Sequence, residues 1–176
     1  MAKIIYKRGM EGQNRLSCIK GIEIGLLNEQ KALIYPKYAE RQMLTAEQIN
    51  RWNAPNETET GALKVTNTSF ATERLRDIGS PAAEWVSQFK YARYSNFALP
   101  SLLAALEIQH QKKEIDALAE TIEGADLLKD YSPNVCSCSR HSKSEGWFAL
   151  GFRGSVSSNS LDYNYLAVPT IIYNYL

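Results

Sequence analysis

The spacing of apolar residues changes at Gly124, and this change limits the folds open to the chain. Between Ser80 and Gly124 the apolar residues recur at helical spacing, with Ser80 and Ser101 in position to cap helices. From Tyr131 onward the helical period is lost, serine becomes frequent, and apolar residues alternate with other types. A helical middle followed by a strand-rich C-terminal part is therefore predicted.

The N-terminal half adds a hairpin and a short helix to this pattern. Residues 21–27 and 31–35 predict two short strands joined by a turn. Thr45 and Gln48 stand in capping-box register, which predicts a helix to about Trp52. The β-branched and aromatic run 165–176 predicts one buried closing strand. Strands, then helices, then strands indicate a single α+β domain with small antiparallel sheets and helices packed against them.

Composition narrows the classes of function. The 176 residues are 44% apolar and 22% charged, as in an ordinary globular protein, and carry a formal net charge of +1. So small a charge gives no field of one sign to attract nucleic acid or an anionic membrane. The sequence lacks the roughly 20-residue apolar stretch of a membrane span and the apolar core of a signal peptide. We expect cytoplasmic synthesis, no nucleic-acid partner and no membrane insertion, with assembly onto a virion or cell surface left open.

Three cysteines and two histidines give little support for chemistry. Cys136 and Cys138 form a close pair, and His141 follows three residues later, but no second ligand pair stands at zinc-site spacing. We interpret the cysteines as small residues of a surface strand or loop, and His110 as a solvated residue on a polar helix face. No nucleophile-elbow, metalloprotease, P-loop or dinucleotide motif is present. We therefore expect no catalytic residues, no metal and no cofactor.

A polar segment near the C-terminal end stands between two apolar flanks. Tyr, Ser, Asn, Trp and Arg together resemble the composition of antibody binding loops, where rigid rings lie beside adaptable polar groups. A serine-rich surface loop over a small sheet is the alternative. Phe148 alternates with Trp147 along a predicted strand, so only one of the two faces solvent, and the pattern leaves open which. The candidate ligand-binding residues are Cys138, Arg140, His141, Lys143, Trp147, Phe148, Arg153, Ser155, Ser157, Asn159, Asp162, Tyr163 and Asn164.

Three segments resemble a known family in order and spacing. They are FALPSLLAAL (97–106), GWFALGFRGSV (146–156) and YLAVPTIIY (165–173). They are similar to the W-x-L-P-S-x-x-E-L, A-W-x-V-x-F-x-x-G-x-V and Y-x-V-R-P-V-x-x-F segments of the C-type-lectin-like domains of the Fibrobacter succinogenes major paralogous domain family. Ala104 replaces the family's glutamate, and the arginine before Pro169 is absent. The resemblance implies a C-type-lectin-like domain at 21–176, after an N-terminal arm at 1–20.

The same resemblance implies a function, because the family includes variable proteins of diversity-generating retroelements. In these proteins an error-prone reverse transcriptase rewrites adenines near the 3′ end of the gene. We therefore expect a diversified face at 136–165 that binds a cell-surface protein or glycan, as a phage receptor-binding protein or an adhesin. Calcium is not expected to be required, and homo-oligomerisation is left open. The alternatives are an assembly protein of fixed specificity and a cysteine-dependent oxidase of the formylglycine-generating type.

Overall fold

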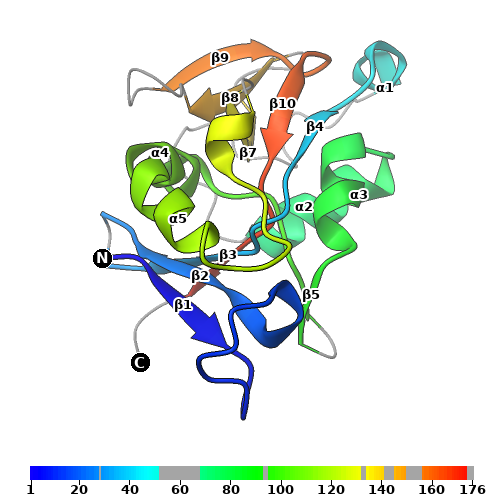
Figure 1. The fold of residues 1–176 in the computed structure, drawn as a ribbon. Coiled ribbons are helices and arrows are strands. Elements are labelled where there is room, and N and C mark those ends of the chain that lie inside the picture. The colour runs from blue at the N-terminus through cyan, green and yellow to red at the C-terminus, as the bar shows by residue number, and fades with distance from the viewer. Residues whose placement is uncertain are drawn as a thin grey trace.

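The described residues form two main sheets and a small two-stranded one, with helices packed between and beside the main sheets (Figure 1). The computed structural model describes residues 1–27, 29–51, 68–92, 95–131, 134–140, 145–149 and 156–173. The helices are α1 (Ala46–Arg51), α2 (Thr68–Asp77), α3 (Pro81–Ser87), α4 (Leu102–His110) and α5 (Lys112–Ala119), with short 3-10 turns at Leu16–Cys18 and Leu128–Asp130. The strands are β1 (Lys3–Tyr6), β2 (Ile19–Gly25), β3 (Lys31–Ile34), β4 (Ala39–Gln42), β5 (Lys90–Ala92), β6 (Ser95–Asn96), β7 (Val135–Arg140), β8 (Glu145–Ala149), β9 (Val156–Ser160), β10 (Asn164–Ala167) and β11 (Thr170–Tyr173).

The first sheet has four strands in the order β1-β2-β3-β11. The predicted hairpin is confirmed, because β2 and β3 pair antiparallel with Ile22 opposite Ile34. The expected arm at 1–20 is wrong in part, since β1 pairs antiparallel with β2 inside this sheet. The strand Lys3–Tyr6 is short and has charged or polar neighbours, so its sequence alone did not predict pairing.

The predicted helix caps are confirmed by side-chain hydrogen bonds. Ser80 Oγ accepts a hydrogen bond from the Ala83 backbone N–H at 3.1 Å, and Ser101 Oγ accepts one from Ala104 at 3.2 Å. Such caps satisfy backbone donors that have no partner within the first turn of a helix. At the other end of a helix, Gly79 follows α2 with a φ of +85°, a left-handed conformation that glycine adopts without strain.

The capping box before α1 is present as well. The Gln48 backbone N–H donates to Thr45 Oγ1 at 3.2 Å, and Gln48 Oε1 accepts from the Thr45 N–H at 2.9 Å. The helices cover less of the stretch from Ser80 to Gly124 than its apolar spacing predicts, because α3 ends at Ser87 and α5 ends at Ala119, five residues before Gly124.

The second sheet has five strands in the order β4-β10-β7-β8-β9. Strand β10 pairs antiparallel with β4 and parallel with β7, so the sheet is mixed. The prediction of one closing strand is wrong, because β10 belongs to this sheet and β11 to the first one. The break lies at Val168 and Pro169, where proline has no N–H to continue a ladder.

Two hydrophobic clusters fill the interior, and the five-stranded sheet separates them. Val135 and Leu166 belong to the cluster that also contains residues of α4, α5 and the first sheet. Cys136 and Tyr165 belong to the other cluster, which contains residues of α2 and α3 and is called the α2–α3 cluster below. Neighbouring residues of β7 and of β10 thus point to opposite faces, and both faces are buried. The predicted α+β class is confirmed, and the central strands of the second sheet are buried on both sides.

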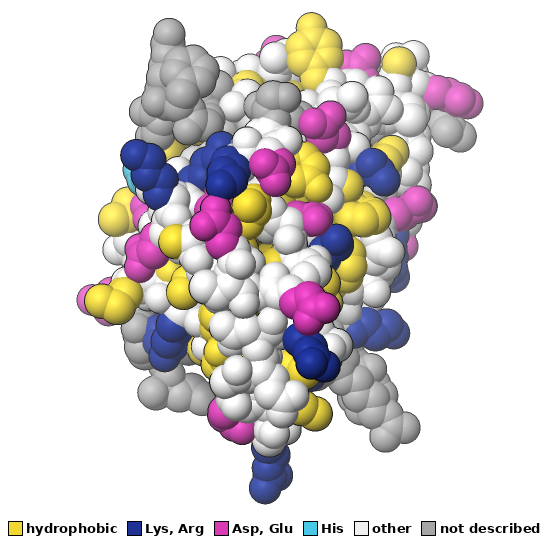
Figure 2. Space-filling model, viewed as in Figure 1, with side chains coloured by type: hydrophobic (Ala, Val, Ile, Leu, Met, Phe, Trp, Pro, Cys, Tyr) yellow, Lys and Arg dark blue, Asp and Glu magenta, His cyan; other side chains and the backbone are white. Residues whose placement is uncertain are grey.

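The surface carries charges of both signs. In Figure 2, Lys and Arg side chains alternate with Asp and Glu over the face that is seen, which agrees with the net charge of +1. None of the helices in the described ranges combines the length and apolar character needed to span a bilayer.

Candidate binding face

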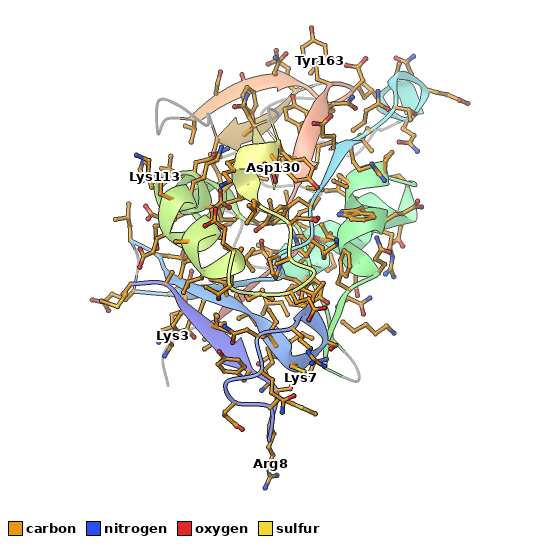
Figure 3. All side chains as sticks on the ribbon, in the orientation of Figure 1. Lys3, Lys7, Arg8, Lys113, Asp130 and Tyr163 are labelled. Carbon is orange, nitrogen blue, oxygen red and sulfur yellow. The ribbon has the colours of Figure 1, made fainter. Side chains whose placement is uncertain are left out.

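The candidate site is a polar surface formed by β9, the turn after it and the start of β10, at one end of the molecule (Figure 1). We define the C-terminal polar face as Ser157–Ser160 together with Asp162–Asn164. Tyr163 and Asn164 are exposed, with 56% of Tyr163 accessible, and the rest of the face is half-buried. Figure 3 shows Tyr163 directed away from the body of the molecule, opposite the end at which Arg8 lies. Its members come from the edge strand β9, from the turn that follows, and from the first residue of β10.

Leu161 anchors the turn between β9 and β10 by both its side chain and its backbone. The side chain is 4% exposed and packs in the α2–α3 cluster. The carbonyl oxygen accepts hydrogen bonds from the Met43 N–H at 3.1 Å and the Leu44 N–H at 3.0 Å. Gln42 Nε2 donates to the Asp162 carbonyl oxygen at 2.6 Å. The segment 42–44 therefore fixes the turn through groups that are independent of the exposed side chains.

Tyr165 supports the same turn from below. Its hydroxyl donates to the Ser160 carbonyl oxygen at 2.6 Å, and its ring centroid lies 5.3 Å from that of Phe148. Burial, followed by the nearby thiol of Cys136, raises the pKa of Tyr165 well above its ordinary value of 10.0. The hydroxyl consequently remains protonated and keeps its donor at any physiological pH.

Strand β9 lies in register with β8. Phe148 stands opposite Ser157, Trp147 opposite Ser158, and Glu145 opposite Ser160. The Ser158 hydroxyl donates to Glu145 Oε2 at 3.5 Å, and the Ser160 hydroxyl donates to Asp162 Oδ1. Because β9 is the last strand of the sheet, its outer backbone edge has no further strand beside it among the described residues.

Two candidate binding residues are corrected by their burial. Cys138 is 2% exposed and Phe148 is 5% exposed, so neither offers its side chain to a ligand. Both lie in the α2–α3 cluster, because alternate residues of β7 and β8 point into it. The interpretation of the cysteine pair as surface residues is wrong for the same reason. Burial also raises the pKa of the Cys136 thiol to about 12, which keeps it protonated.

Five of the candidates lie in the C-terminal polar face: Ser157 and Asn159 on β9, Asp162 and Tyr163 in the turn, and Asn164 at the start of β10. For Arg140 on β7 and Trp147 on β8, the structure describes the backbone and not the side chain. His141, Lys143, Arg153 and Ser155 lie outside the described residues.

Sequence reasoning missed the residues that hold the face in place. Gln42 is 120 residues away from Asp162, so no local pattern could connect the two. Leu161 carried a signal, since it is the one aliphatic residue in the polar stretch from 157 to 164. His110 is exposed as expected, and its Nδ1 lies 3.4 Å from Glu107 Oε1.

In the part of the chain that the structure describes, no three His, Cys, Asp or Glu side chains gather closely enough to hold a metal ion. Comparison with known protein families, with curated proteins and with solved structures finds no match for this chain.

Proposed function

We propose that the chain is a ligand-binding protein of C-type-lectin-like fold, which recognises a cell-surface protein or glycan through its C-terminal polar face. The fold part of this proposal is supported by where the three resembling segments lie. The first leads into α4, the second begins in β8, and the third runs from β10 to β11. The described part of each segment therefore belongs to the framework that carries the face.

The observation that carries the functional part is the separation of anchoring groups from outward groups. The turn is held by Leu161, by the segment 42–44 and by the Tyr165 hydroxyl. None of these bonds involves the side chains of Tyr163 or Asn164. Side chains at these two positions can be exchanged without removing an anchor, which is what a diversified binding surface on a rigid scaffold requires.

The chemistry of the face suits a polar partner. Tyr163 offers a large amphipathic ring with few rotatable bonds, and tyrosine is common in binding loops for that reason. Asn159 and Asn164 each carry an amide that both donates and accepts, and the serines add hydroxyls. Such groups match the hydroxyls of a glycan or the polar surface of a protein.

Sequencing the 3′ end of the gene across a natural population tests the proposal of diversification. We expect substitutions at adenines in the codons of Ser157, Asn159, Tyr163 and Asn164. The codons of the buried residues between Cys136 and Tyr165 should stay constant, since their side chains fill the core. An invariant face, or substitutions spread evenly along the gene, would favour an assembly protein of fixed specificity.

Binding is tested separately by adding fluorescently labelled protein to intact cells collected where the sequenced population lives. The double variant Tyr163→Ala/Asn164→Ala should lose most of its cell binding while retaining the thermal stability of the parent. The matched control is Arg8→Ala/Met10→Ala, which changes two exposed residues of another loop. Equal binding by the parent and both variants would contradict recognition through the C-terminal polar face.

A further inference from the structure

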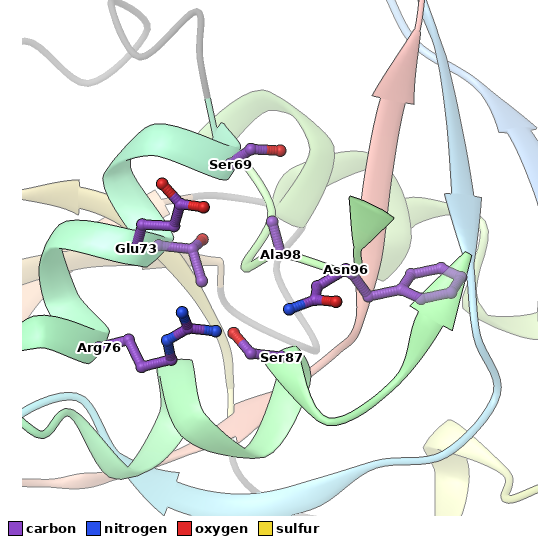
Figure 4. A pocket seen from close by; sticks show the side chains of 8 residues that line it. Ser69, Glu73, Arg76, Ser87, Asn96 and Ala98 are labelled. Carbon is purple, nitrogen blue, oxygen red and sulfur yellow. The ribbon is translucent and has the colours of Figure 1, made fainter. Parts of the chain in front are cut away.

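A separate cavity of about 220 Å³ opens between α2, α3 and β6 (Figure 4). None of its lining residues belongs to the C-terminal polar face. Six of the eight have hydroxyl, amide or charged side chains, and one of these six, Thr72, is buried. The lining residues are Ser69, Thr72, Glu73, Arg76, Ser87, Asn96, Phe97 and Ala98.

The cavity presents one negative and one positive side chain to the same space. Glu73 and Arg76 stand three residues apart on α2, and Figure 4 shows them on one side of the cavity, with Ser87 and Asn96 across from Arg76. Residues at this spacing share a helix face. Within the described ranges, neither forms an ion pair within 4.0 Å, although the two charges are neighbours. Both groups are therefore available to a ligand.

The walls behind these groups are fixed. Thr72 is 2% exposed, and its Oγ1 accepts a hydrogen bond from the Leu99 N–H at 3.0 Å, which leaves the hydroxyl proton for another acceptor. Ala98 exchanges two backbone hydrogen bonds with Thr170 of β11, at 3.0 and 2.8 Å. A rigid wall lowers the entropy cost of binding, because little of the protein must be ordered when the ligand binds.

Phe97 makes the cavity a poor site for a sugar. Phe97 is 1% exposed, and its ring packs 5.5 Å from the ring centroid of Tyr35 and 6.3 Å from that of Tyr91. The ring is thus occupied on the inside of the protein. A sugar would find hydrogen-bonding groups in this cavity but no exposed ring to cover its apolar face.

We propose that this cavity binds a free α-amino acid, with the ligand carboxylate on Arg76 and the ligand ammonium on Glu73. A guanidinium pairs with a carboxylate through two parallel hydrogen bonds, and a carboxylate accepts strongly from an ammonium. Ser87, Asn96 and the Thr72 hydroxyl add neutral hydrogen bonds. The volume lies below the roughly 300–1,000 Å³ of pockets for drug-sized molecules, which suits a smaller ligand.

Isothermal titration calorimetry with the full chain tests this assignment. The probes are glycine, L-serine and L-glutamate, and the comparison compounds are acetate, ethylamine and glucose. We expect saturable heat with at least one amino acid at concentrations up to about 10 mM, and a weaker response to each comparison compound. Binding of acetate or glucose as tight as that of every amino acid would overturn the proposal, as would no heat from any amino acid.

Two variants connect the heat to this cavity. Arg76→Gln and Glu73→Gln should each weaken amino-acid binding by about tenfold or more, because each removes a charge-assisted hydrogen bond. Both residues are exposed, so the fold should be kept, and melting curves of the variants check this. The matched controls are Arg8→Gln and Glu84→Gln, two exposed residues outside the lining. Unchanged affinity in both cavity variants would place the amino acid elsewhere and overturn the proposal.

Discussion

A buried side chain supplements the backbone ladders of the four-stranded sheet, whereas the outward side chains of the C-terminal polar face take no part in holding its turn. In the sheet, the carboxylate of Glu23 on β2 accepts from Lys3 on β1 at 3.4 Å, from Lys31 on β3 at 3.1 Å and from Tyr173 on β11. One side chain thus connects all four strands through other side chains. In the polar face, the turn is held mainly through its own backbone carbonyls and one buried leucine.

This difference indicates where the sequence can vary. Where a buried side chain adds to the backbone pairing, as Glu23 does, its exchange removes contacts to several strands, so that position is closely constrained. Where backbone groups make the connections, the identity of an outward side chain has little effect on the fold. The polar face can therefore keep its backbone shape while its outward side chains are exchanged.

The strongest test compares two neighbours within the turn itself. Leu161→Ala should lower the free energy of unfolding by about 2–5 kcal/mol, because it leaves a cavity in the α2–α3 cluster. Tyr163→Ala should change it by no more than about 0.5 kcal/mol, since its side chain is exposed. Urea unfolding curves of both variants provide the measurement. Similar losses in the two would show that the outward side chains help to hold the turn.

The second test uses two glycines of β2. A Cβ on Gly21 would lie 2.5 Å from the Ile34 carbonyl oxygen and 3.0 Å from Leu33 Cγ, whereas one on Gly25 would meet nothing within 4 Å. Gly21→Ala should therefore destabilise the fold by about 1–3 kcal/mol, because β2 and β3 must separate locally. Thermal unfolding compares it with Gly25→Ala, which has the same change in composition. A loss for Gly25→Ala as large as that for Gly21→Ala would contradict close strand approach as the cause.

The smallest expected effect concerns pH and Glu23. Burial raises the pKa of this carboxyl, but hydrogen bonds from Tyr173, Lys31 and Lys3 lower it more, so the net pKa lies below the ordinary 4.5. The folded state therefore binds fewer protons than the unfolded state. The resulting stabilisation is complete above the ordinary value and is lost as pH falls through the lowered pKa.

The variant Glu23→Gln isolates this contribution. At neutral pH it should be less stable than the parent, and the difference in the free energy of unfolding should shrink as the pH is lowered below 4.5. Urea titrations at several pH values measure that difference, in which the other carboxyl groups largely cancel. A difference that is constant with pH would mean that Glu23 contributes by packing rather than by charge.

Local features of this fold could be predicted from the sequence, and pairings between distant segments could not. The caps at Ser80 and Ser101 depend on residues three positions away, so a short window contains all that determines them. Strand β4 is Ala-Glu-Arg-Gln, a composition with little strand preference, and it forms because β10 pairs with it. No pattern within residues 39–42 predicts pairing with β10, which lies more than 120 residues later in the chain.

The candidate site shows the same division. Polar and aromatic composition singled out Tyr163 and Asn164, and the structure places both of them at the surface. Composition wrongly placed Cys138 and Phe148 at the surface. Their strands have buried residues on both faces, so no alternation of polar and apolar residues shows which side chains point inward. Only the three-dimensional arrangement assigns these two to the interior.

The passage of the chain from β10 to β11 makes both main sheets depend on one late segment of the chain. Strand β10 lies between β4 and β7 in one sheet, and β11 completes the other sheet beside β3. During synthesis, neither sheet can close until residues 164–173 have emerged from the ribosome, so the earlier segments must wait with their apolar surfaces uncovered. A frameshift or stop codon anywhere before Asn164 removes a strand from each sheet at once. Only chains read through to this crossing would display the C-terminal polar face.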